Sequence, residues 1–190
     1  MKNLISSSTI KLVAIVGFSA LVVNAHAAVL TASTADAQIN SDGTQNNTDY
    51  QARIGEFYYP GGASYVAPFL LPTLGAGEEF STANLRTQLY GLPPVGPAAN
   101  ADLYGLGRRA ADTVLASDYY SGTGDGSDAT LIQAGFFTDS MALGLKYTDA
   151  GGDAALVSYL NAQYAGGAGA GQYVFIRISY AANIPNTKNL

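Results

Sequence analysis

The chain of 190 residues contains no cysteine and no tryptophan, and its only histidine is His26. Without cysteine there can be no disulfide, no thiol nucleophile and no cysteine-ligated zinc site. His26 lies in a segment that we expect to be removed on export, so the mature chain would also lack the base of a Ser-His-Asp triad. We therefore expect a non-catalytic protein without a cofactor.

Charge is also scarce, because only 12% of the residues are charged and the formal net charge is −5 at pH 7. Nine basic residues face 14 acidic ones, and two of the nine, Lys2 and Lys11, lie in the same N-terminal segment as His26. Nucleic-acid binding needs clustered Lys and Arg to neutralise phosphates. The sequence shows no such cluster, so we expect no nucleic-acid partner.

A long apolar run occurs only near the N-terminus, from Leu12 to Val23, where lysines precede it. Ala25 and Ala27 then occupy the small-residue positions of a signal-peptide cleavage site. The pattern predicts a signal peptide over residues 1–27 and one domain over residues 28–190, located outside the cell or at its surface. An uncleaved N-terminal anchor is the alternative. The mature chain has no further apolar stretch of about 18 residues, so we expect no membrane span after cleavage.

Much of the mature chain alternates between apolar and polar residues, with Gly, Pro, Asn and Asp clusters between the alternating stretches. In one stretch the two faces carry Ala83, Leu85, Thr87 and Leu89 against Thr82, Asn84, Arg86, Gln88 and Tyr90. Two others place Leu143, Leu145 and Tyr147, or Val174, Ile176 and Ile178, on one face. Pro68 indicates an edge or a bulge in its stretch. Many short strands between turn signals predict an all-β, jelly-roll-like β-sandwich.

One segment breaks the alternation, because residues 153–164 carry large side chains four positions apart. This spacing predicts one short helix near the C-terminus, capped by Asp153 and ended by Gly166 or Gly167. The glycines follow the helix and precede a strand. A phosphate-binding loop has the order strand, glycines, helix, so we interpret the glycine tract as a return loop rather than a nucleotide site.

The chain is rich in tyrosine, with 13 residues, and Tyr119 and Tyr120 lie beside a loop rich in Gly and Asp. Sugar rings stack on aromatic faces, and a tyrosine hydroxyl adds a hydrogen bond. Tyr119 and Tyr120 are therefore our candidate ligand-binding residues, with a polysaccharide as the expected ligand. The alternative is that they pack in the core, as tyrosines on strands commonly do.

Acidic residues offer two further candidates. Asp118, Asp125 and Asp128 lie in one glycine-rich loop, but they lack the spacing of an EF-hand, so a plain Asp/Gly turn is the better interpretation and metal binding stays open. The adjacent Glu78 and Glu79 would point to opposite faces of a strand. They therefore do not predict a glycosidase pair, which needs two carboxylates that face each other.

Several short motifs follow one another in a fixed order: Asp36-Ala37, Phe69-Leu70-Leu71, Thr82-Ala83-Asn84-Leu85, Asp102-Leu103-Tyr104, and the helix, glycines and strand of residues 155–178. In this order they resemble the DNRLRE-type β-sandwich domains of exported surface and matrix proteins of environmental bacteria. Some members of that family are classed among carbohydrate-binding modules. The resemblance covers most of residues 36–180 and implies a jelly-roll-like fold with weak glycan binding.

We therefore expect a secreted, non-catalytic β-sandwich at the cell surface or in the extracellular matrix, with weak glycan binding as its activity. The alternative is a structural subunit that assembles itself into an extracellular fibre or coat. In that case the extended N-terminal strand would add to the sheet edge of a neighbouring copy. An enzyme is the third and least favoured hypothesis.

Overall fold

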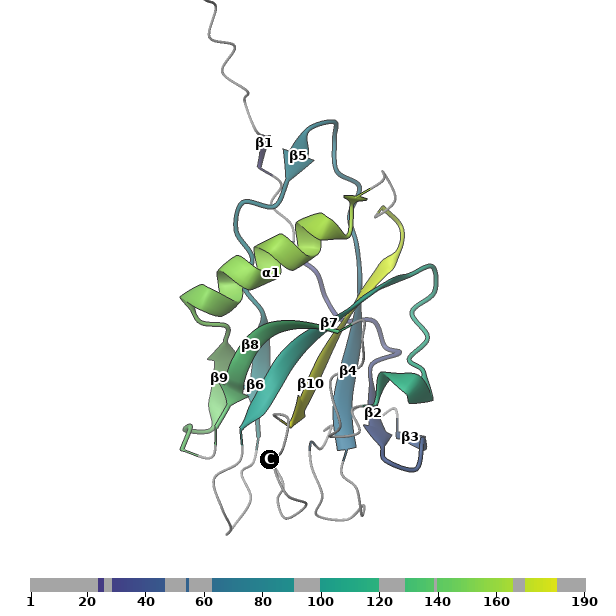
Figure 1. Cartoon of the computed structure of the whole chain (residues 1–190), viewed down its shortest axis with the longest axis vertical. Coiled ribbons are helices and arrows are strands. Elements are labelled where there is room, and N and C mark those ends of the chain that lie inside the picture. Colours follow the sequence, from purple (N-terminus) through teal and green to yellow (C-terminus); the bar gives the residue numbers. More distant parts are fainter. Residues whose placement is uncertain are drawn as a thin grey trace, which may run out of the picture.

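The computed structural model describes residues 24–25, 29–46, 54, 63–90, 100–119, 129–138, 140–165 and 170–180. These residues are mostly β-structure, with one α-helix, α1 (Ala150–Ala162), and one short 3-10 helix, η1 (Ala116–Asp118) (Figure 1). The prediction of a β-protein with one helix near the C-terminus is confirmed at this level. Among the described residues, no helix is both long enough and apolar enough to cross a membrane.

Six strands form one antiparallel sheet in the order β3-β2-β4-β10-β7-β8. The strands are β2 (Ala37–Asn40), β3 (Gln45–Asn46), β4 (Ala63–Leu70), β7 (Ala101–Arg109), β8 (Thr130–Phe137) and β10 (Tyr173–Tyr180). β10 lies in the middle and pairs with β4 on one side and β7 on the other. The last described strand therefore joins the earlier ones into a single sheet.

Four shorter strands form two further pairs. β6 (Arg86–Leu89) and β9 (Gly144–Tyr147) form an antiparallel ribbon, which we call the β6–β9 ribbon. β1 (Asn24–Ala25) pairs in parallel with β5 (Glu78–Glu79). Because β1 lies inside the predicted signal peptide, cleavage after Ala27 would remove this second pair.

The central strands of the six-stranded sheet carry buried side chains on both faces. On β10 the predicted set Val174, Ile176 and Ile178 contributes to the larger core cluster, which also contains buried residues of α1. We call this side of the sheet the inner face. Phe175 points to the opposite side and joins a smaller cluster with residues of β2 and β4. Alternation along one strand thus supplies apolar side chains to two separate cores.

The helix begins three residues before the predicted start. Asp149 is the N-cap: its backbone is extended, and its carboxylate accepts a hydrogen bond of 2.8 Å from the Gly152 amide. The prediction that Asp153 caps the helix is wrong, because the Asp153 carboxylate accepts hydrogen bonds from the Thr148 hydroxyl and the Asn84 amide instead. The helix ends at Ala162. The glycines that we expected to end it, Gly166 and Gly167, lie outside the described residues.

Tyr159 fixes the helix to the inner face through a close contact with a glycine. A Cβ atom at Gly105 would lie 2.3 Å from the Tyr159 ring, so the ring occupies the space that a side chain on β7 would need. The Tyr159 hydroxyl accepts a hydrogen bond of 2.8 Å from the Gly107 amide and lies 3.1 Å from the Phe175 carbonyl oxygen. Burial raises the pKa of Tyr159 above its usual value.

Pro68 lies where the pairing of β4 changes partner. β2 pairs with β4 only as far as Val66. Beyond that point the N-terminal segment takes over, with an isolated bridge from Ala32 and a hydrogen bond of 2.8 Å from the Ser33 amide to the Pro68 carbonyl. The N–H and C=O of a residue in antiparallel pairing point to the same neighbour. The N–H that proline lacks would therefore face this change of partner and not β10. The predicted edge or bulge is not found, because β4 is an inner strand and its register with β10 runs unbroken past Pro68.

Candidate functional site

The β6–β9 ribbon exposes one complete face, which we call the outer face. It consists of Arg86, Gln88 and Tyr90 from the β6 side, and Leu143, Leu145 and Tyr147 from the β9 side. The two tyrosines and two leucines are between 52% and 63% exposed. The sequence predicted that each set shares a face, and this is confirmed. It did not predict that the apolar set on β9 would face solvent.

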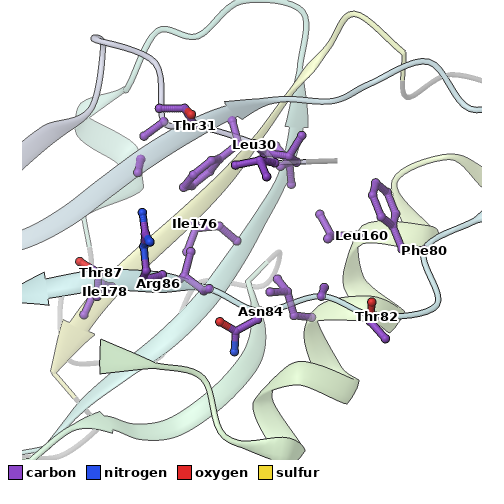
Figure 2. Close-up of a pocket in the computed structure, with 18 of the residues that line it drawn as sticks. Leu30, Thr31, Phe80, Thr82, Asn84, Arg86, Thr87, Leu160, Ile176 and Ile178 are labelled. Carbon is purple, nitrogen blue, oxygen red and sulfur yellow. The ribbon is translucent and has the colours of Figure 1, made fainter. Parts of the chain in front are cut away.

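The opposite side of β6 borders an apolar cavity of about 460 Å³, which we call the slot. Its floor is the inner face of β4 and β10, and its two long walls are residues 29–32 and residues 82–87. Figure 2 shows Leu30 and Thr31 along one wall, Arg86 and Asn84 along the other, and Ile176 between them. Phe80 and Leu160 lie together at one end. A volume of this size is within the range of small-molecule and peptide pockets.

The wall formed by β6 presents its backbone to the slot. The Leu85 amide donates to the Thr148 hydroxyl, and the Thr148 amide donates to the Leu85 carbonyl, so the polar groups of Leu85 point toward β9. In an antiparallel pair, successive residues point their N–H and C=O groups to opposite edges. The groups of Arg86 and Gln88 therefore point away from β9. Within the described ranges, no backbone group pairs with them.

Two of the polar side chains around the slot, those of Tyr65 and Asn84, have hydrogen-bond partners within the chain. Tyr65 donates a hydrogen bond of 2.7 Å to Asp36. Burial raises the pKa of Tyr65 above its usual value, and the hydrogen bond to Asp36 and the negative charge of Asp36 raise it further. Asn84 is held by Thr148 and Asp153. Arg86 differs from both, because no carboxylate in the described part of the chain forms an ion pair with it. The slot is thus an apolar space with its engaged polar groups at the margin.

Tyr119, the first candidate for sugar stacking, is half-buried. It packs against the smaller core cluster of Ala37, Ile39, Val66, Val114 and Phe175. Tyr120, the second candidate, lies outside the described residues. The structure therefore places one member of the pair, and it places that ring against a core rather than on an open face.

Asp118 is buried and holds the loop that follows β7. Its carboxylate forms an ion pair with Arg109 and accepts a hydrogen bond of 2.9 Å from the Leu115 amide. Both carboxylate oxygens are thus engaged within the chain. Asp125 and Asp128 lie outside the described residues. In the described part of the chain, no group of three or more His, Cys, Asp or Glu residues is placed to hold a metal ion.

Glu78 and Glu79 form the short strand β5. The Glu78 carboxylate accepts a hydrogen bond of 2.6 Å from the Gly75 amide, which closes the turn before the strand. Glu78 therefore has a local structural role in this turn.

Comparison with known proteins adds no relative, because no family model, no curated protein and no solved structure matches the chain. The resemblance to DNRLRE-type domains stays a prediction. The two features that sequence reasoning missed are the open outer face with its tyrosines and the edge of β6 that has no backbone partner among the described residues. The alternation in both strands was the available signal, but it did not show which side of each strand would be covered.

Proposed function

We propose that the protein is an exported, non-catalytic binding domain of jelly-roll-like sandwich architecture, and that it holds a polysaccharide weakly at the cell surface or in the extracellular matrix. The observation that carries the proposal is the outer face of the β6–β9 ribbon. It replaces Tyr119 and Tyr120 as the leading candidate site, because both of its aromatic rings are open to solvent.

The outer face has the chemistry that a sugar chain needs. Tyr147 lies opposite Arg86, and Tyr90 directly follows β6, four residues after Arg86, which is about 13 Å in an extended chain. A flat apolar ring with a polar tip suits a sugar, whose faces are apolar and whose edge carries hydroxyl groups. Arg86 and Gln88 lie between the rings and supply hydrogen-bond donors. The face therefore offers two stacking positions joined by polar contacts.

Export and the lack of catalysis are supported by the sequence. The N-terminal segment has the order of a signal peptide, namely lysines, an apolar run and a small-residue site. After its removal the chain would contain neither histidine nor cysteine. A binding role requires neither residue, whereas most nucleophilic hydrolases require one of them.

Replacing the exposed rings tests the proposal. Each of Tyr147→Ala and Tyr90→Ala removes one stacking position, which contributes about 1 kcal/mol, so retention by polysaccharide should weaken about fivefold. Affinity electrophoresis over a panel of neutral and acidic polysaccharides measures the effect. Leu115→Ala is the matched control, since Leu115 is an exposed apolar side chain outside the outer face and its loss should leave retention unchanged.

Tyr119→Ala separates the two candidate sites. Because Tyr119 packs against a core cluster, its removal should lower the thermal unfolding midpoint and leave retention unchanged. The proposal fails if no polysaccharide retards the wild-type protein. It also fails if Tyr119→Ala abolishes retention at unchanged stability while Tyr147→Ala and Tyr90→Ala have no effect.

A further inference from the structure

We propose that the slot is an acceptor for a β-strand, and that the strand it accepts is the segment of residues 29–31 from a second copy of this chain. We call residues 29–31 the donor segment. This inference is independent of the polysaccharide proposal, because it uses the edge and the inner side of β6, whereas the polysaccharide would lie on the outer face.

The first argument comes from the backbone of β6. Arg86 and Gln88 direct their N–H and C=O groups away from β9, and these groups have no backbone partner within the described residues. A row of unpaired groups on a strand edge is a template for another strand. Most sheet edges open onto solvent, but at Arg86 this one borders an apolar cavity. An added strand would therefore gain backbone hydrogen bonds and apolar contacts together.

The second argument is the fit of a strand in the slot. Leu85, which directly precedes β6, faces the floor formed by β4 and β10. A strand paired with β6 would continue this layer, so alternate side chains would point toward Ala67 and Ile176 on the floor. Three extended residues span about 10 Å, which fits within the roughly 13 Å of the four residues 84–87 along the wall. The slot thus has the length and depth for a short strand.

The third argument identifies the donor. Val29 is 95% exposed although it is apolar, and residues 29–31 belong to no strand or bridge. Pairing with β4 begins only at Ala32, and Ser33 is tied further by a hydrogen bond from its hydroxyl to Asp112. The chain therefore holds the base of the donor segment and leaves the segment unpaired beside the slot. Cleavage after Ala27 would place it at a free end, which can enter another molecule without threading a loop.

Exchange between copies follows from these positions. The donor segment of one copy enters the slot of another, pairs with β6 there, and buries the side chain of Val29. A reciprocal exchange gives a closed dimer, and a sequential one gives an open chain of copies. Both arrangements use the same donor and the same acceptor, so one set of variants tests them.

The acceptor is tested by a proline at Arg86. Arg86→Pro removes an N–H that points into the slot and leaves the pairing between β6 and β9 intact, since that pairing uses Leu85, Thr87 and Leu89. Arg86→Ala is the matched control, because it removes the same side chain and keeps the N–H. Light scattering on the secreted protein should show association for the wild type and Arg86→Ala, and a monomer for Arg86→Pro.

The donor is tested by deletion and by mixing. A variant without residues 28–31 loses that wall of its slot but keeps Ala32 and Ser33 on β4, the edge of β6 and the floor of β4 and β10, and should be monomeric. Mixed with Arg86→Pro, which retains its donor segment, it should form pairs of one molecule of each variant and nothing larger. This recovery requires a donor on one molecule and an acceptor on the other, so it would not arise from general instability.

Two measurements on the wild-type protein keep the inference testable if a variant fails to fold. A synthetic peptide of residues 28–35 should dissociate the assembly, and a scrambled peptide should not. Hydrogen exchange at the Arg86 and Gln88 amides should be at least tenfold slower in the assembly than in the monomer. A wild-type protein that stays monomeric at all concentrations overturns the inference, as does an assembly in which these two amides exchange freely.

Discussion

The inner face of the six-stranded sheet is covered in two different ways. Over β7 and β8 the helix α1 packs directly on the strands, and Tyr159 fills the place of a side chain at Gly105. Over β4 and β10 the cover consists of residues 29–32 and the single edge of β6, which leave the slot between them. The half over β7 and β8, which we call the closed half, is therefore tightly packed. The half over β4 and β10, which we call the open half, is covered only along its two sides.

This difference has a simple physical origin. The helix α1 covers one half of the face with buried side chains, whereas only one edge of the ribbon, that of β6, borders the other half. The β6–β9 ribbon has an outer face in solvent and an inner side that does not extend across to the N-terminal segment. The apolar floor beneath is left without a covering strand. The slot therefore lies between the edge of β6 and the N-terminal segment.

The sharpest test of the closed half is Gly105→Ala. The new Cβ would lie 2.3 Å from the Tyr159 ring, so the helix or the strand must shift. Overpacking of this kind costs about 3 kcal/mol of the free energy of unfolding. Urea unfolding followed by circular dichroism measures it. A loss below about 0.5 kcal/mol would show that α1 is not held against β7 as described.

The next test uses pH and compares one tyrosine from each half. Burial raises the pKa of Tyr159 in the closed half and of Tyr65 at the slot. A raised pKa means that the fold favours the neutral phenol. This contribution is fully present below the unfolded-state pKa of about 10 and is lost as pH rises above it.

Urea midpoints should therefore stay level between pH 8 and 9.5 and fall between pH 10 and 12. Tyr159→Phe and Tyr65→Phe should each reduce that fall, although Tyr159→Phe also costs about 1 kcal/mol at neutral pH because the Gly107 amide loses its partner. Phenolate absorbance provides an independent check. Full ionisation of both tyrosines near pH 10, with the protein still folded, would contradict the assignment.

The smallest effect is expected in the open half, for Ala67→Leu. Ala67 lines the floor of the slot, and three added carbon atoms can enter the empty volume. We expect a change of less than about 1 kcal/mol in the free energy of unfolding, in contrast to the loss for Gly105→Ala. The same variant should weaken self-association, because the new side chain occupies the space of the donor segment. A destabilisation above about 2 kcal/mol would show that the slot is closed in solution.

Local patterns in the sequence were enough for several elements. The alternation along residues 82–90 predicted both sides of β6 correctly, since a strand repeats every two residues whatever surrounds it. The spacing of large side chains likewise predicted one helix near the C-terminus. The helix start was missed because Asp149 and Asp153 are both good capping residues, and contacts with Thr148 and Asn84 decide between them.

The sequence by itself determined where the chain is extended, where it is helical and which residues share a face, because these depend on neighbours a few positions away. Only the tertiary structure decided which face meets solvent. Leu145 and Ile176 each lie in an alternating apolar row, yet Leu145 is exposed and Ile176 is buried. The same holds for the slot, whose walls come from segments about 50 residues apart. Coverage of a face depends on which distant segment packs against it, and no local period encodes that partner.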